Sequence, residues 1–161
     1  EHGDYLFMHG ENIDVDGFRL NGNYSFQYCR NVVIRNAEIH SKDAFWNTED
    51  VTVYDSVVDG EYLGWHSRNL RLVNCRISGT QALCYAENLV LENCTLGEDA
   101  DLCFEYSSVH AEIKGRVHSV KNPRSGRIVA EEYGDIILDE HCKAPANCSI
   151  ETGKKQSGEA A

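Results

Sequence analysis

The sequence predicts an all-β protein, a single-stranded right-handed parallel β-helix of about six to seven coils with about 19 residues per coil. The first observation is repetition, because segments of the same pattern begin 19 residues apart at Asn31, Asp50, Asn69 and Asn88. The second is the spacing of apolar residues within each segment, which has the period of a strand. The third is that residues 19 apart match in type and complement each other in charge.

Each repeat opens with a period-two alternation of apolar and more polar residues, which is typical of a half-buried strand. The alternating apolar pairs are Val32 and Ile34, Val51 and Val53, Leu70 and Leu72, and Leu89 and Leu91. An Asn or Asp follows, as at Asn36, where the side chain supports a bend. A second short strand then contains Ile39 or its equivalent. After a corner rich in Gly, Ser and Asp, the pattern predicts a third strand around Phe45, Leu83 and Leu102.

Residues one coil apart are expected to lie about 4.8 Å apart and to form ladders. One ladder contains asparagine-type side chains, which bond to each other along the axis: Asn12, Asn31, Asp50, Asn69 and Asn88. Another alternates in charge: Glu11, Arg30, Glu49, Arg68 and Glu87. Three further predicted pairs are Asp16 with Arg35, Lys42 with Glu61, and His40 with Asp59. Opposite charges stabilise such stacks and like charges would destabilise them.

The predicted β-helix covers residues 1–138, and residues 139–161 are expected to form a C-terminal cap and a flexible tail. Beyond Ser108 one inserted residue brings Val109, and then Ile128, to the place of Leu89. The chain begins partway through a repeat, and its first coil has no cap of its own. We therefore expect either preceding coils or association with a second copy through exposed coil ends.

Composition excludes some partners and favours one compartment. The 15 basic and 26 acidic residues give a net charge of −11, which would repel nucleic acid and anionic membranes. No apolar run approaches the roughly 18 residues of a membrane-spanning helix. The seven cysteines are interpreted as core thiols, which predicts a reducing, cytoplasmic setting. A disulfide framework or a metal site is the alternative, but the zinc-type spacing of cysteines is absent and we expect no cofactor.

The chain resembles a bacterial family of uncharacterised function over about Asp4 to Ile150. The resemblance lies in the segments DYLFMHGENI, GNYSFQYCRNVVIRNAEI, KDAFWNTEDVTVYDS, GEYLGWHSRNLRLVNC, LCYAENLVLENCT and VKNPRSG. It implies a cytoplasmic protein with the right-handed parallel β-helix of the pectate-lyase-like superfold, of which this chain would be the C-terminal half. It implies no activity, because fold alone does not specify a reaction.

A candidate ligand site follows the third predicted strand, where aromatic and polar residues recur in three columns. The columns are Tyr5, Tyr24, Asp43, Tyr62 and Gln81; Met8, Gln27, Trp46, Trp65 and Cys84; and His9, Tyr28, Asn47, His66, Tyr85 and Phe104. Aromatic rings with Asp, Asn and His beside them suit a saccharide-like ligand. The candidate binding residues are Tyr24, Tyr28, Asp43, Trp46, Tyr62, Trp65, His66 and Tyr85. The alternative is that these rings pack in the core, since the sequence leaves open which of Phe45 and Trp46 points inward.

We expect a non-enzymatic binding or structural module, with a carbohydrate-active lyase or hydrolase as the alternative. Hydrolysis of a glycoside needs two carboxyl groups roughly 5–9.5 Å apart. Asp43 and Glu61, with His66 beside them, are the candidates for catalysis on the same face. Asp59 with His40 is a second acid–base pair, which the ladder arrangement also explains as neutralisation. Glu98, Asp99 and Asp101 could hold Ca²⁺, but a solvated acidic corner is the favoured interpretation.

Overall fold

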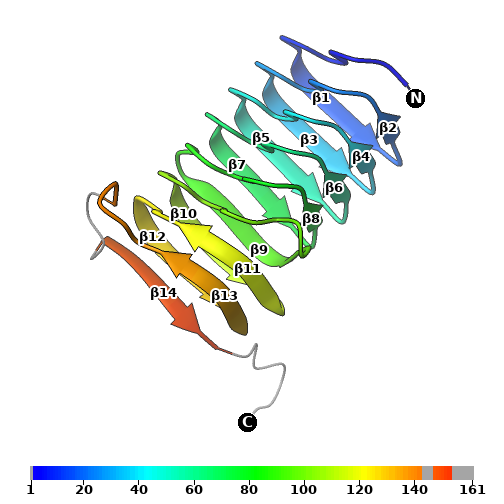
Figure 1. Ribbon diagram of the computed structural model, residues 1–161. Coiled ribbons are helices and arrows are strands. Elements are labelled where there is room, and N and C mark those ends of the chain that lie inside the picture. The colour runs from blue at the N-terminus through cyan, green and yellow to red at the C-terminus, as the bar shows by residue number, and fades with distance from the viewer. Residues whose placement is uncertain (1, 143–146, 154–161) are drawn as a thin grey trace.

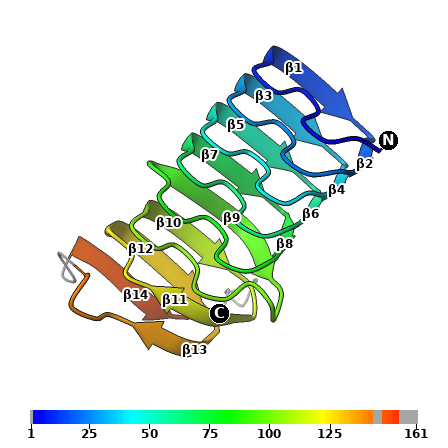
Figure 2. The same ribbon diagram turned by 45° about the horizontal axis from the view of Figure 1, so that its top comes forward.

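A computed structural model, which describes residues 2–142 and 147–153, confirms the predicted parallel solenoid. It has about seven turns of about 19 residues and contains no helix among the described residues. Successive coils stack along one axis, with the first and last coils at opposite ends (Figure 1). Their connecting segments follow nearly parallel paths along the stack (Figure 2).

One side of the solenoid is a parallel sheet of long strands, and it contains the predicted first strand of each repeat. The strands are β1 (Glu11–Asp16), β3 (Arg30–Arg35), β5 (Glu49–Tyr54), β7 (Arg68–Val73), β9 (Leu89–Leu96), β10 (Ser108–Ile113), β12 (Ser125–Ala130) and β14 (Cys148–Thr152). Val32 pairs with Val51, and Val51 pairs with Leu70, so residues 19 apart are neighbours as predicted.

A second side contains the predicted short strands. They are β2 (Arg19–Asn21), β4 (Glu38–His40), β6 (Val57–Asp59) and β8 (Arg76–Ser78). Strand β9 is long enough to turn the corner, since it pairs with both β7 and β8. Towards the C-terminus, β11 (Arg116–Lys121) and β13 (Glu132–Ile137) pair as a separate two-stranded sheet.

The third side differs from the prediction, because it is built of turns and not of strands. Every second residue there has a left-handed backbone, as at Tyr24 (φ 62°), Phe26 (φ 56°) and Tyr28 (φ 58°). Their amides bond alternately to the following and the preceding coil: Tyr24 N donates to Lys42 O (2.8 Å) and Phe26 N to Leu6 O (2.8 Å). This conformation is uncommon for residues other than glycine. The bonds between coils offset its strain.

The core lies between the three sides and is formed by stacked apolar side chains. Phe26 and Phe45 are fully buried, and their rings stack with centroids 5.3 Å apart. The structure therefore places Phe45 inward and Trp46 outward. Five of the seven cysteines, Cys29, Cys75, Cys84, Cys94 and Cys103, are buried free thiols, which agrees with their interpretation as core residues.

The asparagine ladder forms as predicted along the edge of the long-strand side, whereas the charged ladder forms at its N-terminal end and Arg68 bonds instead to Asn47 Oδ1 (2.9 Å). Asn31 Nδ2 donates to Asn12 Oδ1 (2.7 Å) and Asn88 Nδ2 donates to Asn69 Oδ1 (2.8 Å). In the charged column Arg30 lies between Glu11 (3.8 Å) and Glu49 (3.5 Å).

Two predicted charge pairs differ in the structure. In the described part of the chain Lys42 forms no ion pair with Glu61, and its Nζ lies 5.9 Å from the centroid of the Tyr62 ring. Arg35 Nη1 contacts Asp14 (3.1 Å) and not Asp16, because the arginine leans back along the neighbouring strand past the residue directly opposite. Asp16 instead accepts a bond from Asn36 Nδ2 (3.0 Å), as part of a second amide ladder. The predicted pair of His40 with Asp59 is present at 3.2 Å.

The register changes after the fifth repeat. Val109 does pair with Leu89, which confirms the predicted single insertion. The predicted equivalence of Val109 and Ile128 is wrong: Val109 pairs with Gly126, and Ile128 pairs with Ala111, because this coil is two residues shorter than the repeat. Strand β14 then extends the sheet beyond β12. Most of the predicted flexible tail lies outside the described residues, and the boundary at residue 138 stays a prediction.

Candidate functional site

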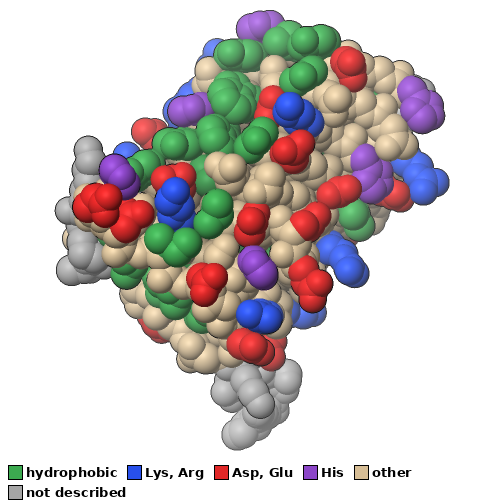
Figure 3. Space-filling view, viewed as in Figure 1, with side chains coloured by type: hydrophobic (Ala, Val, Ile, Leu, Met, Phe, Trp, Pro, Cys, Tyr) green, Lys and Arg blue, Asp and Glu red, His purple; other side chains and the backbone are tan. Residues whose placement is uncertain are grey.

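The candidate site is a strip of outward-facing side chains on the third side of the solenoid, which we call the aromatic strip. In each coil the turn presents three outward positions, and two adjacent residues between them, such as Ala44 and Phe45, point into the core. Figure 3 shows hydrophobic side chains, the colour class that includes Tyr and Trp, gathered along one side of the solenoid with histidines beside them. We define the aromatic strip by Tyr24, Tyr28, Asp43, Trp46, Tyr62, Trp65, His66, Tyr85 and Tyr106.

The strip divides into two groups of rings. Near the N-terminus Tyr24 stacks on Tyr5 (4.9 Å between centroids) and Tyr28 stacks on His9 (4.9 Å). The next coil places Asp43 and Asn47 at the equivalent positions, so both columns of rings are interrupted there. The structure therefore brings six of the eight predicted binding residues to the central part of the strip, and leaves Tyr24 and Tyr28 one coil away.

The central group is held together by ring contacts across three coils. Trp46 and Trp65 stack with centroids 5.6 Å apart and an interplanar angle of 20°. Tyr62 and His66 meet Trp65 edge to face, at 5.3 Å and 6.3 Å. Tyr85 lies 4.9 Å from Trp65 and stacks on His66 at 5.2 Å. Offset-stacked and edge-to-face pairs are the favoured aromatic geometries, so these contacts stabilise the group.

Stacking along the axis determines which surfaces of the rings are available. Because Trp46 and Trp65 face each other, they present their edges outward and not their faces. Trp65 Nε1 donates to Gln81 O (2.7 Å). Within the described part of the chain, no acceptor occupies Nε1 of Trp46, so this indole donor is available to a ligand.

The stack opens at its C-terminal end into a surface groove. Tyr85 and Tyr106 have centroids 5.7 Å apart and an interplanar angle of 42°, compared with 19° for His66 and Tyr85. Beside them lies a groove of about 490 Å³, lined by His66, Tyr85, Glu87, Tyr106 and Arg124. Rings from three successive coils and two oppositely charged side chains therefore converge on one hollow.

Three of these groove residues were missed from the sequence. The coil after Leu96 contains two extra residues on the third side, so Tyr106, and not the predicted Phe104, continues the column of Tyr85. Phe104 is fully buried, and its prediction as a member of this column is wrong. Glu87 was predicted only as part of a charge ladder, and Arg124 lies in the segment VKNPRSG, for which the sequence predicted no binding role.

Asp43 has an unusual environment for a carboxylate. Its Oδ1 is buried and has no hydrogen-bond partner. Among the described residues, every other buried side-chain nitrogen or oxygen has one. Partial burial raises the pKa of this carboxyl group, while Lys42 opposes the rise and Glu61 adds to it. A carboxyl group held in this way accepts a proton or a hydrogen-bond donor more readily than an exposed aspartate.

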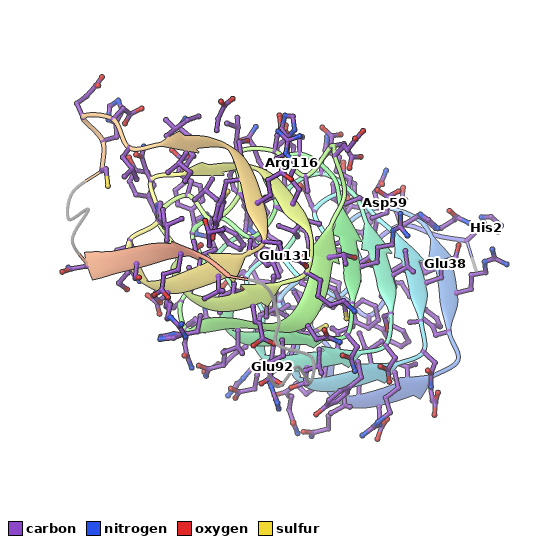
Figure 4. The ribbon with its side chains drawn as sticks, turned by 90° about the horizontal axis from the view of Figure 1, so that it is seen from below. His2, Glu38, Asp59, Glu92, Arg116 and Glu131 are labelled. Carbon is purple, nitrogen blue, oxygen red and sulfur yellow. The ribbon has the colours of Figure 1, made fainter. Side chains whose placement is uncertain are left out.

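The other predicted acid–base residues lie elsewhere. His40 bridges Glu38 (Nε2–Oε1, 2.8 Å) and Asp59 (Nδ1–Oδ2, 3.2 Å) across strands β4 and β6, and Figure 4 shows Glu38 and Asp59 on this short-strand side. Its hydrogen bond to Glu38, with a smaller contribution from Asp59, raises the pKa of His40. Because Ser78 also donates to Asp59 (2.7 Å), the network is a surface ladder of satisfied charges.

Two of the three acidic residues in the Leu96–Leu102 corner bond to the protein. Asp99 accepts a bond from Gly79 N (3.3 Å), and Asp101 accepts one from the Thr80 hydroxyl. Across the described residues, no group of three His, Cys, Asp or Glu side chains is arranged to hold a metal ion.

A family model described as "Protein of unknown function (DUF3737)" matches residues 1–151. No curated protein and no solved structure matches the chain. Nor does the described part of the chain include a helix of the length and apolar character needed to span a membrane.

Proposed function

We propose that this chain, which belongs to the family "Protein of unknown function (DUF3737)", has a non-enzymatic binding or structural role. In this role the aromatic strip binds a saccharide-like ligand. The observation that carries this proposal is the groove at the end of the strip, where His66, Tyr85 and Tyr106 are outward-facing and lie beside Glu87 and Arg124.

The chemistry of the groove suits a ring that has apolar faces and polar edges. The open angle between Tyr85 and Tyr106 leaves part of each ring face free for the C–H face of a sugar. The Glu87 carboxylate accepts bonds from hydroxyl groups, and the Arg124 guanidinium donates them. Further along the strip the free Nε1 donor of Trp46 would contact a longer ligand.

The rigidity of the scaffold also supports a binding role. Tyr85 N donates to Glu105 O (2.7 Å) and Tyr106 N donates to Asn122 O (2.8 Å), so the rings are mounted on backbone that is bonded to the next coil. Little ordering of the site is then required when a ligand binds, and this reduces the entropy cost of binding.

Calorimetric titration with a panel of neutral oligosaccharides tests this proposal. We expect binding that the Tyr85→Ala substitution weakens about tenfold, which corresponds to loss of about 1.4 kcal/mol of ring contact. Tyr54→Ala is the matched control, because Tyr54 lies on β5, outside the strip, against Arg35. The absence of binding across the panel, or an equal loss in both variants, would refute the proposal.

An enzyme acting on the same ligands is a second candidate, which the raised pKa of Asp43 and its interaction with Glu61 favour. In that case Asp43 would serve as the general acid, Glu61 as the second carboxylate and His66 as a neighbouring polar group. Replacing Asp43 by Asn and Glu61 by Gln separates the two functions. The amides would abolish turnover by an enzyme, whereas binding to a non-enzymatic strip would change little.

We propose in addition a cytoplasmic location and self-association through exposed coil ends. The unpaired thiols of the described cysteines support a reducing compartment. Self-association is supported by strand β1, which among the described strands pairs with β3 only, and by the partly exposed apolar residues Phe7, Ile13 and Phe18 beside it. Light scattering after size-exclusion chromatography tests it, and a monomer at all concentrations would exclude it.

A further inference from the structure

We infer that the groove at the C-terminal end of the aromatic strip selects a saccharide bearing one anionic group, and that Arg124 is the residue that recognises this group. The inference rests on the proposed saccharide-binding function and adds the chemical class of the ligand. It also assigns a binding role to Arg124, which was not among the binding residues predicted from the sequence.

Arg124 is held in place by its backbone. Its amide donates to Ser107 O (2.9 Å), while Tyr106 N donates to Asn122 O (2.8 Å), so one hydrogen-bonded unit carries both the arginine and a ring of the groove. Asn122 is itself fixed by Asp139, which accepts a bond from Asn122 Nδ2 (2.9 Å). The guanidinium group is therefore presented beside Tyr106 by an ordered turn.

Among the described residues, six of the eight other arginines of this acidic protein contact a carboxylate, whereas Arg68 donates instead to Asn47 Oδ1 (2.9 Å) and Arg76 has no such contact. Arg71 contacts Glu92 at 2.9 Å and Arg127 contacts Glu151 at 2.8 Å. Within the described residues the Arg124 guanidinium forms no such ion pair, although Glu87 lines the same groove. The nearby carboxylate of Glu105 contacts Lys121 (3.6 Å). The groove thus contains a positive charge whose five donors are available to a ligand.

The charges around the groove restrict the ligand to a single anionic group. A guanidinium group matches a carboxylate or phosphate through two parallel hydrogen bonds. Glu87 on the same groove accepts sugar hydroxyls but repels a second anion. The net charge of −11 opposes a polyanionic chain that would run along the strip towards Asp43. A short saccharide with one carboxylate or one phosphate is therefore the ligand class that fits.

The test compares three probes on the full chain: D-glucose, D-glucuronate and D-glucose 6-phosphate. We expect the native protein to bind at least one anionic probe about tenfold more tightly than glucose, with a preference that decreases as salt is added. Whichever anionic probe is preferred identifies the carboxylate or the phosphate. In Arg124→Gln the preference should disappear while glucose binding is retained, and Arg124→Lys should keep part of it.

Arg76→Gln is the matched control, since it removes the same charge from β8, outside the groove, and should leave the preference unchanged. Equal binding of all three probes by the native protein would overturn this inference and leave the proposed function intact. Unchanged discrimination in Arg124→Gln would overturn it as well. Absence of binding by every probe would count against both.

Discussion

Replacing Asp43 by asparagine should stabilise the protein at neutral pH. Burial raises the pKa of Asp43 in the folded state, and its buried Oδ1 has no partner, so the fold penalises the ionised form. Below the unfolded pKa of about 3.9 the carboxyl group is protonated in both states and the penalty is absent. As the pH rises through the raised folded pKa, the penalty develops fully. The Asp43→Asn variant should therefore gain stability over the native protein as the pH increases.

The magnitude follows from the partial burial of this side chain. An unpaired polar atom that is fully buried costs about 1–3 kcal/mol. Because Asp43 is partly exposed and solvent screens its charge, we expect a gain of about 0.5–1 kcal/mol near pH 7 and almost none near pH 3.5. Urea denaturation at several pH values measures the difference.

Asp135→Asn is the control for the Asp43 experiment, because it changes the net charge equally at an exposed site on β13. A loss of stability in Asp43→Asn at pH 7, or a gain that does not depend on pH, would refute the reasoning. If the expected gain is observed, the native carboxylate is retained at a cost to stability, as is common for residues with a role in a site.

Three further predictions concern the stack itself, each measured by urea denaturation. Asp50→Asn should stabilise the protein by about 0.5 kcal/mol, because an amide at this left-handed position can also donate to Asn31 and complete the ladder. A loss of stability would contradict this prediction. Phe45→Ala should destabilise by about 3–5 kcal/mol, since it removes a fully buried stacked ring, and a loss below about 1 kcal/mol would show that the core is not stacked as described. His40→Gln should lower the stability of the protein more at pH 6 than at pH 9. Contact with Glu38 raises the pKa of His40 in the folded state. The stabilisation by His40 is therefore complete below about pH 6.5 and is lost as the pH rises through the folded pKa. An equal loss at both pH values would refute that assignment.

The long-strand side and its ladders could be predicted from the sequence because both depend on a constant repeat length. With 19 residues in each coil, Val32, Val51 and Leu70 must lie over one another, and period-two alternation places them inside. The stack of Trp46 on Trp65 and the bond between Asn69 and Asn88 follow from the same register, and both are present.

The third side could not be predicted in the same way, because its backbone has no sequence signal of its own. Left-handed residues are usually glycine or asparagine, whereas here they include Tyr24 and Phe26. Such a conformation is stable only because their amides bond to adjacent coils, which is a tertiary property. The indirect signal was the loss of alternation, since Ala44 and Phe45 are adjacent and both point inward.

The groove was missed for a related reason. Two extra residues on one side of a coil shift the column from Phe104 to Tyr106. A later deletion partly restores the register, so that Val109 lies only one residue beyond the 19-residue repeat. The repeat length alone therefore gives the wrong residue for this column. Arg124 lies outside the repeating pattern altogether. Its place beside Tyr106 results from the hydrogen bonds of the turn that contains Asn122.

Mapping of amide and indole NMR signals during titration with glucose and glucuronate tests the central claim most directly. The account predicts that the shifts concentrate on His66, Tyr85, Tyr106 and Arg124. The outer face of the long-strand sheet, marked by Glu92 and Arg127, should remain unchanged. Shifts confined to that sheet, or no shifts with either sugar, would contradict the assignment of the aromatic strip as a binding site.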